Sequence, residues 1–128
     1  MATKETKQIS EKRRFKRIPA PVGTTALFKN IDGSLEKLHV RDISVIGMLV
    51  CGYNSAKRYP INSTINDILI DIPPDELNAG SRISLLIDNC KIVRSFFEQD
   101  SKILCHGIEL TYKSSYLKEK IESLVNKA

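Results

Sequence analysis

Short apolar runs separated by turn residues occupy most of the sequence after Pro19, and this pattern restricts the possible folds most strongly. The clearest run spans residues 64–72, where Ile68 and Ile70 alternate with Asp67 and Leu69. A period of two places successive side chains on opposite faces of a strand. The run therefore predicts a strand with one apolar face and one polar face.

Comparable runs recur along the chain. The runs that we interpret as strands cover residues 24–31, 34–44, 47–51, 64–72, 83–97 and 102–112. Residues 30–33 (Asn-Ile-Asp-Gly) form a turn signal, and we expect the run 83–97 to be a hairpin that turns near Asp88 and Asn89. About six antiparallel strands in so short a chain favour a small closed β-barrel, because closure removes exposed strand edges.

The pattern changes period at the C-terminus. Leu117, Ile121, Leu124 and Val125 recur at helical spacing, and Ser114 or Ser115 is able to cap the start of a helix. We expect one amphipathic helix at about residues 114–127, packed against the barrel. A length of 128 residues suits one domain, which we place at 13–128.

The net charge of +5 is confined to one end of the chain. Residues 1–17 hold seven basic and two acidic residues, whereas residues 18–128 hold 13 of each and are neutral overall. Residues 1–12 are polar and lack periodicity, which predicts a flexible arm. A neutral body with a basic arm is typical of a local anion-binding site rather than of a uniformly basic nucleic-acid binder.

Several classes of protein are not expected. Cys51, Cys90 and Cys105 are odd in number and lie in apolar surroundings, which predicts buried free thiols in a reducing compartment and a cytoplasmic location. No apolar run approaches the roughly 18 residues that span a bilayer, and residues 1–17 contain no hydrophobic segment, so we expect neither membrane insertion nor a secretory signal. The sequence holds no P-loop, nucleophile elbow, acid–base pair or metal-ligand spacing, so we expect no catalytic residues and no metal site.

Two short motifs stand out. Arg13 and Arg17 form an RxxxR pattern, and Asp42, Ser44 and Gly47 form a DxSxxG pattern that begins 25 residues after Arg17. An arginine fork matches the N7 and O6 acceptors of guanine, a pairing worth about 1–3 kcal/mol of discrimination. The same planar group clamps phosphates.

The second motif complements the first. A carboxylate at Asp42 is able to accept from the opposite edge of guanine, which carries the ring N–H and the amino group. We expect Ser44, two residues further on, to point to the same face. Gly47 lacks a Cβ, so a flat base is able to approach the backbone there. Each motif also has a plainer interpretation: a solvated basic tail for the arginines, and an ordinary strand end with a local serine hydrogen bond and a glycine bulge for the second.

In this order and on this strand pattern, the two motifs resemble the signature of the PilZ domain family. The resemblance covers about residues 11–125 and implies a six-stranded antiparallel barrel with a C-terminal helix. It implies the bacterial second messenger cyclic di-GMP as ligand, with no other cofactor. Arg13 and Arg17 would hold guanine edges and phosphates, and Asp42, Ser44 and Gly47 would form the base-binding surface.

The resemblance also bears on finer points. Lys12 precedes the first motif, where a basic residue in the family often accompanies an intercalated ligand dimer, and Arg14 and Lys16 are expected to assist with phosphates. Ile46 stands where the family often has a glycine, and Leu110 where it often has an aromatic residue, which concerns packing more than binding.

The leading hypothesis is therefore a non-enzymatic receptor. Ligand binding would order the basic arm and change a surface presented to a protein partner, with no nucleic acid bound. Two alternatives remain open: a small β-barrel that binds nucleic acid through the basic arm, and a PilZ-like interaction module that binds no ligand. Few aromatic residues (6%) count against the first, because they leave few stacking platforms. The intact motifs count against the second.

Overall fold

The computed structural model describes residues 16–29, 33–53, 58–74, 80–112 and 114–127. The expected arm at residues 1–12 lies outside the described residues, as do Arg13 and Arg14 of the first motif.

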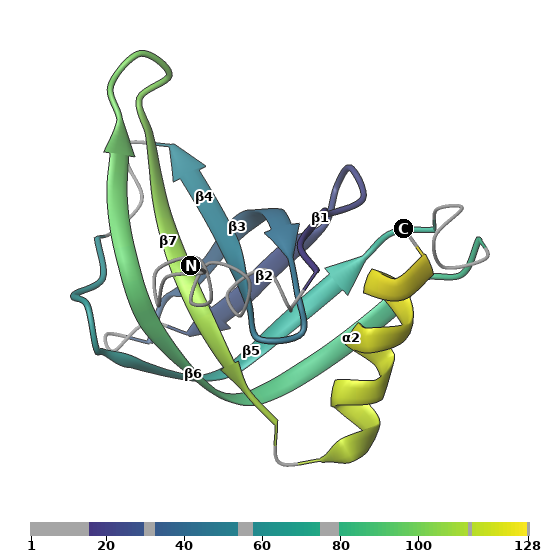
Figure 1. The fold of residues 1–128 in the computed structure, drawn as a ribbon. Coiled ribbons are helices and arrows are strands. Elements are labelled where there is room, and N and C mark those ends of the chain that lie inside the picture. The colour runs from purple at the N-terminus through teal and green to yellow at the C-terminus, as the bar shows by residue number, and fades with distance from the viewer. Residues whose placement is uncertain (1–15, 30–32, 54–57, 75–79, 113, 128) are drawn as a thin grey trace, which may run out of the picture.

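The described residues form a closed antiparallel β-barrel with a helix at one end (Figure 1). The elements are β1 (Ile18–Pro19), β2 (Thr25–Lys29), β3 (Leu35–Ile43), β4 (Gly47–Tyr53), β5 (Thr64–Ile72), β6 (Ile83–Glu98), β7 (Ile103–Thr111) and α2 (Ser115–Lys127). The strand order is β1-β3-β2-β5-β6-β7-β4, and pairing of β3 with β4 closes a ring of six strands. The six-stranded barrel expected from the sequence is confirmed.

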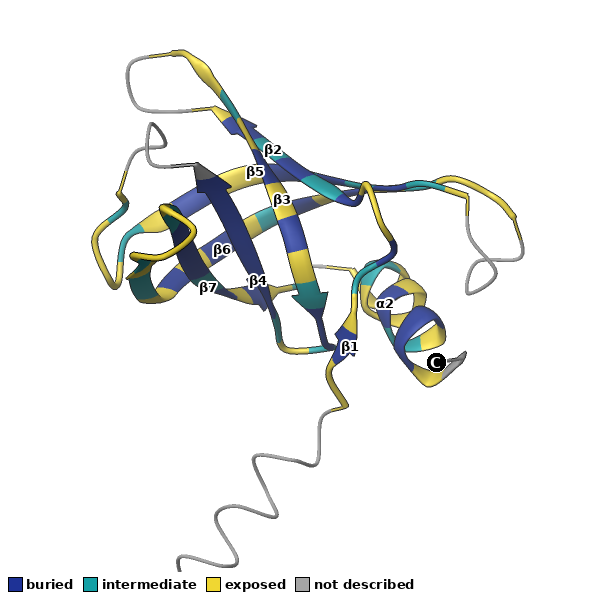
Figure 2. Ribbon diagram, turned by 90° about the horizontal axis from the view of Figure 1, so that it is seen from above, coloured by how far each residue is buried: buried dark blue, intermediate teal, exposed yellow. Residues whose placement is uncertain are grey.

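Alternating apolar residues fill the interior of the barrel. On β5, Ile68, Ile70 and Ile72 are fully buried, while Leu69 and Asp71 point outward and are half-buried. Figure 2 shows the same alternation of buried and exposed residues along β3. Burying an isoleucine side chain contributes about 1.5–3 kcal/mol, so the interior face of each strand fixes its register.

The hairpin expected near Asp88 and Asn89 is wrong, because β6 is one continuous strand of 16 residues. Asn89 pairs with Asn66 on β5 and with Thr111 on β7, so β6 passes from one neighbour to the other at this point. Figure 1 shows β6 curving around the barrel as it does so.

The two polar residues mark a bend rather than a turn. Buried positions on β6 change phase here, from Leu85 and Ile87 to Cys90 and Ile92. The residue that faces the bend on β5, Asp67, has a positive φ of 58°. A polar pair within an apolar run therefore has two structural explanations, a turn or a bend, and the sequence does not distinguish them.

Helix α2 covers the end of the barrel core. Ile121, Leu124 and Val125 are buried in the barrel's hydrophobic cluster, and Leu117 packs against it, as expected. The Ser114 hydroxyl accepts a hydrogen bond from the Tyr116 amide at 3.2 Å, which caps the first turn. Since an isolated helix of this length is marginal in water, burial of its apolar face is what stabilises it. None of the helical residues described here forms a segment both long and apolar enough to cross a bilayer.

Candidate functional site

The short strand β1 brings the two motifs together. Ile18 pairs with Ile43 of β3, and Pro19 pairs with Asp42, so the residue just before β1 must lie beside the second motif. Arg17 is that residue, and its Nε lies 3.8 Å from Oδ1 of Asp42. The Arg17 side chain is 62% exposed and that of Asp42 is 23% exposed. Both groups are therefore reachable from solvent at the mouth of one site.

The rest of the second motif builds the turn between β3 and β4. The Ser44 amide donates to the Gly47 carbonyl at 2.8 Å, and the Ser44 hydroxyl lies 3.2 Å from both the amide and the carbonyl oxygen of Gly47. Ser44 is 2% exposed. Its observed bonds are therefore local, as in the plainer interpretation of the motif, although its side chain still lines the site.

The C-terminal end of β7 holds this turn in place. The Tyr112 hydroxyl donates to the Val45 carbonyl at 2.8 Å, and the Leu110 amide donates to the Ile46 carbonyl at 3.0 Å. Leu110 is buried in the core and Ile46 is exposed at the turn. Ile46 and Leu110, the two residues that differ from the PilZ signature, are thus both compatible with the turn between β3 and β4.

Gly47 has a steric role that the sequence did not reveal. A Cβ built on Gly47 would lie 2.5 Å from the Ile108 carbonyl oxygen on β7. Only glycine permits the two backbones to approach this closely.

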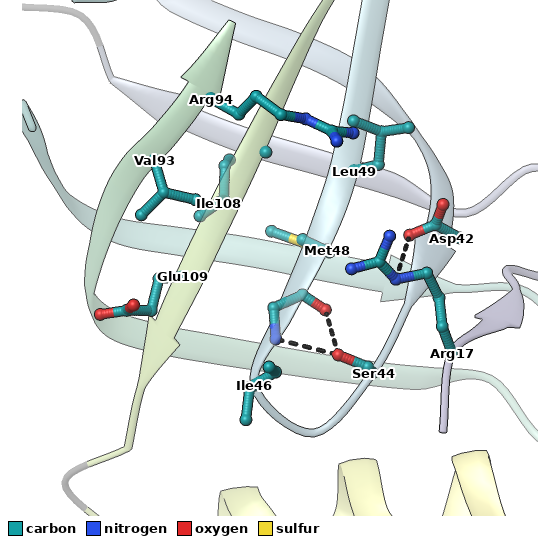
Figure 3. Close-up of a pocket in the computed structure, with 12 residues that line it drawn as sticks. Arg17, Asp42, Ser44, Ile46, Met48, Leu49, Val93, Arg94, Ile108 and Glu109 are labelled. Atoms are coloured by element: carbon teal, nitrogen blue, oxygen red, sulfur yellow. Dashed lines mark hydrogen bonds and ion pairs between the residues drawn. The ribbon is translucent and has the colours of Figure 1, made fainter. Parts of the chain in front are cut away.

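These residues line one open pocket of about 250 Å³ on the outside of the barrel. Figure 3 shows Arg17 and Asp42 meeting at one side of it, with the Ser44 contacts below them. The lining residues are Arg17, Asp42, Ser44, Ile46, Gly47, Met48, Leu49, Val93, Arg94, Gly107, Ile108 and Glu109. Four of the five principal site residues expected from the sequence are therefore in one place, and the fifth, Arg13, lies outside the described residues.

Of the three additional ligand contacts expected, only Lys16 is described. It is exposed and does not line the pocket. Lys12 and Arg14 lie outside the described residues.

Arg94 of β6 and Glu109 of β7 also line the pocket, and sequence reasoning missed both. Arg94 follows a break in register between β6 and β7, and its guanidinium lies 5.0 Å from the centre of the Phe96 ring. The side chain crosses β7 where Gly107 leaves room for it and extends toward Leu49 (Figure 3). Strand alternation alone could not find Arg94, because the irregularity after Ile92 shifts the phase of the strand.

The arrangement presents both signs of charge around one pocket. Arg17 lies just before β1 and Arg94 lies on β6, while Asp42 and Glu109 supply carboxylates. Gly47 and Gly107 also line the pocket, and the space that a Cβ would fill is taken by the Ile108 carbonyl at Gly47 and by the Arg94 side chain at Gly107. Such a surface is suited to a planar heterocycle that bears both hydrogen-bond donors and acceptors and an attached phosphate.

Sequence comparisons identify no relative: no family model matches the chain, and no curated protein matches it.

Solved structures do match. The structure of YcgR from Escherichia coli in complex with c-di-GMP superposes with a TM-score of 0.69 at 16% identity, over 89% of this chain and 44% of YcgR. The PilZ domain of YcgR with c-di-GMP gives a TM-score of 0.62 at 15% identity, over 89% of this chain and 88% of that one.

Two further structures agree. The c-di-GMP complex of MrkH from K. pneumonia gives a TM-score of 0.73 at 12% identity, over 89% of this chain. The Bacillus subtilis inhibitor of motility, MotI, gives 0.70 at 12% identity, over 90% of this chain. The chain spans about half the length of YcgR, MrkH and MotI. At these identities the likeness shows the fold, and the fold of this chain is that of the PilZ domain.

Proposed function

We propose that the chain is a receptor for cyclic di-GMP and binds it in the pocket between Arg17 and Asp42. One observation carries the proposal: residues from two motifs 25 positions apart lie 3.8 Å from each other at one pocket. The structural neighbours YcgR and MrkH were solved with c-di-GMP, which supports the same ligand.

The chemistry of the pocket suggests how the ligand is held. Asp42 accepts from the ring N–H and amino group of a guanine, and Arg17, together with Arg13 of the same motif, donates to N7, O6 or a phosphate. Gly47 lies on the base-binding surface in this proposal, at the end of the turn that the Ser44 hydroxyl holds. We add Arg94 to these residues as a second cation on the β6 side of the pocket.

Because Lys12 is a basic residue just before the first motif, we extend the proposal to two stacked ligand molecules per protomer. Lys12, Arg14 and Lys16 would then meet the additional phosphates. Calorimetry reports this directly as a stoichiometry of two. A stoichiometry of one would remove this part of the proposal and leave the site itself intact.

Signal transmission is proposed to run through the N-terminal segment. Binding would draw residues 1–17 over the ligand, because Arg13 and Arg17 contact it, and the new surface would engage a protein partner. Hydrogen exchange of this segment, measured with and without cyclic di-GMP, tests the step. Equal exchange in both states at saturating ligand would contradict it.

Calorimetry on the purified chain tests ligand binding. We expect saturable heat and a raised melting temperature with cyclic di-GMP. Arg17→Gln and Asp42→Asn should each weaken binding by about 10- to 100-fold, since each removes a contact worth about 1–3 kcal/mol. Arg82→Gln is the matched control, because Arg82 is an exposed cation paired with Asp71 and does not line the pocket.

The possible outcomes distinguish an error in the proposed ligand from an error in the proposed site. No heat and no thermal shift at high ligand concentration would refute the proposed function. Normal binding by both pocket variants would show that the ligand binds elsewhere. Steeply salt-dependent retention on DNA, unaffected by cyclic di-GMP, would favour the nucleic-acid-binding alternative.

A further inference from the structure

Two cysteines face each other on the outside of the barrel. Cys51 of β4 pairs directly with Cys105 of β7, and their Sγ atoms lie 2.6 Å apart. Directly opposed residues of antiparallel strands have Cα atoms roughly 4.5–5.5 Å apart, within the roughly 4.4–6.8 Å that a disulfide accepts. Both cysteines are free thiols here. The register of β4 and β7 therefore permits a bond between them without a shift of either strand.

A surface ion pair covers this pair of thiols. Arg41 of β3 donates two hydrogen bonds to the Glu98 carboxylate of β6, at 3.1 and 3.0 Å. In the barrel β3 and β6 are separated by β4 and β7, so the ion pair has to cross both strands. Arg41 lines the same cavity as Cys51, and its charge interacts with both thiols. Leu49, Phe96 and Ile103 also pack around the two thiols, so Cys51 and Cys105 are only 5% and 0% exposed although they lie on the outer face.

A cavity leads to one of the two sulfurs. It has a volume of about 220 Å³ and is lined by His39, Arg41, Cys51, Gly52 and Ile103. Cys105 does not line it. A small polar oxidant that enters beneath Arg41 therefore meets Cys51 first, with Cys105 directly behind it.

We propose that Cys51 and Cys105 form an oxidation site that hydrogen peroxide converts into a cross-strand disulfide beneath the Arg41–Glu98 ion pair. The Cys51 sulfur attacks the peroxide, the O–O bond breaks, and Cys51 becomes a sulfenic acid with release of one water. The Cys105 thiol attacks that sulfur, the S–O bond breaks, and the S–S bond forms with release of a second water. Each sulfur gives up one electron, and the peroxide accepts two.

Burial of Cys51, together with the charges around it, sets the rate of the first step. Burial raises the pKa of the Cys51 thiol to about 12, and the neighbouring Cys105 adds to this, while the Arg41 guanidinium opposes it and the Glu98 carboxylate raises it further. His39, the cross-strand neighbour of Cys51 on β3, is the remaining titratable group at the cavity. Since the thiolate is the nucleophile, oxidation should be slow near neutral pH and accelerate as the pH rises toward 12.

Mass spectrometry of the full chain tests the site without any ligand. Reduced protein is treated with hydrogen peroxide, unfolded, alkylated and digested without reduction. We expect one intramolecular disulfide joining Cys51 to Cys105, with Cys90 alkylated, because Cys90 is buried in the barrel interior without a partner cysteine. Cys90→Ser should form the same bond, and Cys51→Ser should form none.

The ion pair gives a second readout. Glu98→Gln removes a negative charge that raises the pKa of Cys51, so it should speed disulfide formation several-fold at a fixed pH. Asp71→Asn is the control, since it removes a half-buried carboxylate of β5 that belongs to a different ion pair. Equal rates of disulfide formation in the wild type, Glu98→Gln and Asp71→Asn would contradict the role given to the ion pair.

The proposal fails if all three cysteines are alkylated after peroxide treatment that fully oxidises free dithiothreitol. It also fails if the bond involves Cys90 or joins two molecules. Because the assay contains no cyclic di-GMP, neither result bears on the proposed receptor function.

Discussion

Gly47 lies in the proposed ligand motif, yet the structure gives it a role in folding that is separable from binding. An alanine Cβ at this position would lie 2.5 Å from the Ile108 carbonyl oxygen. This is a backbone atom of a paired strand, so relief requires β4 or β7 to move. Overpacking of this kind typically costs about 1–3 kcal/mol. We therefore expect Gly47→Ala to reduce the free energy of unfolding by about 2 kcal/mol, which lowers the melting temperature by roughly 8 °C in a domain of this size.

Gly107 provides the matched control for this substitution. It also lines the pocket, but a Cβ there would lie 3.2 Å from the Arg94 Cβ, so the neighbouring residue has to move by only a few tenths of an ångström. The free energy of unfolding of Gly107→Ala should therefore lie within about 1 kcal/mol of that of the wild type. Chemical denaturation followed by circular dichroism measures both variants. If Gly47→Ala is as stable as Gly107→Ala, the close approach of β4 to β7 does not require glycine, and the argument from backbone contact is refuted.

Three further predictions concern stability. Burial lowers the pKa of His106 below its ordinary 6.5, so the folded state binds a proton less readily than the unfolded state. The free energy of unfolding should therefore be highest above about pH 6.5 and fall as the pH drops below it. His106→Gln should remove that loss, measured by denaturant titrations across this pH range. A disulfide between Cys51 and Cys105, which are 54 positions apart, should raise the free energy of unfolding by about 4 kcal/mol, measured by comparing oxidised and reduced protein. Ser114→Ala should cost about 1 kcal/mol through loss of the helix cap, whereas Ser115→Ala should cost less; equal losses by calorimetry would contradict the capping role.

The sequence predicted the barrel and the helix well, because both depend on local periodicity. Alternation on β5 and helical spacing near Ile121 each reflect burial against the same core. The pattern failed at Asp88 and Asn89, where the continuation of β6 depends on β5 and β7 pairing with opposite edges of one strand. That pairing is non-local, so no short window of sequence contains it.

The candidate site was predictable only in part, for a related reason. The residue types of the two motifs suggested guanine and phosphate chemistry, and Arg17 and Asp42 do lie together. Glu109 joins them because β7 pairs with β4 opposite Gly47, and Arg94 joins them through the register of β6 and β7, which an irregularity after Ile92 displaces. The local bonds of Ser44 were anticipated as an alternative, but the clash that excludes a Cβ at Gly47 required the position of a third strand.

The weak contact between Arg17 and Asp42 bears on how the proposed receptor would bind its ligand. At 3.8 Å and with the arginine 62% exposed, such an ion pair contributes at most about 1 kcal/mol to stability. Breaking it therefore costs little, and each partner would gain stronger hydrogen bonds if a guanine supplied donors to Asp42 and acceptors to Arg17, as proposed. Until then the pair holds both groups at the pocket mouth and offsets their charges. A closer, buried pair at the same position would compete with the ligand, because separating it would leave two desolvated charges.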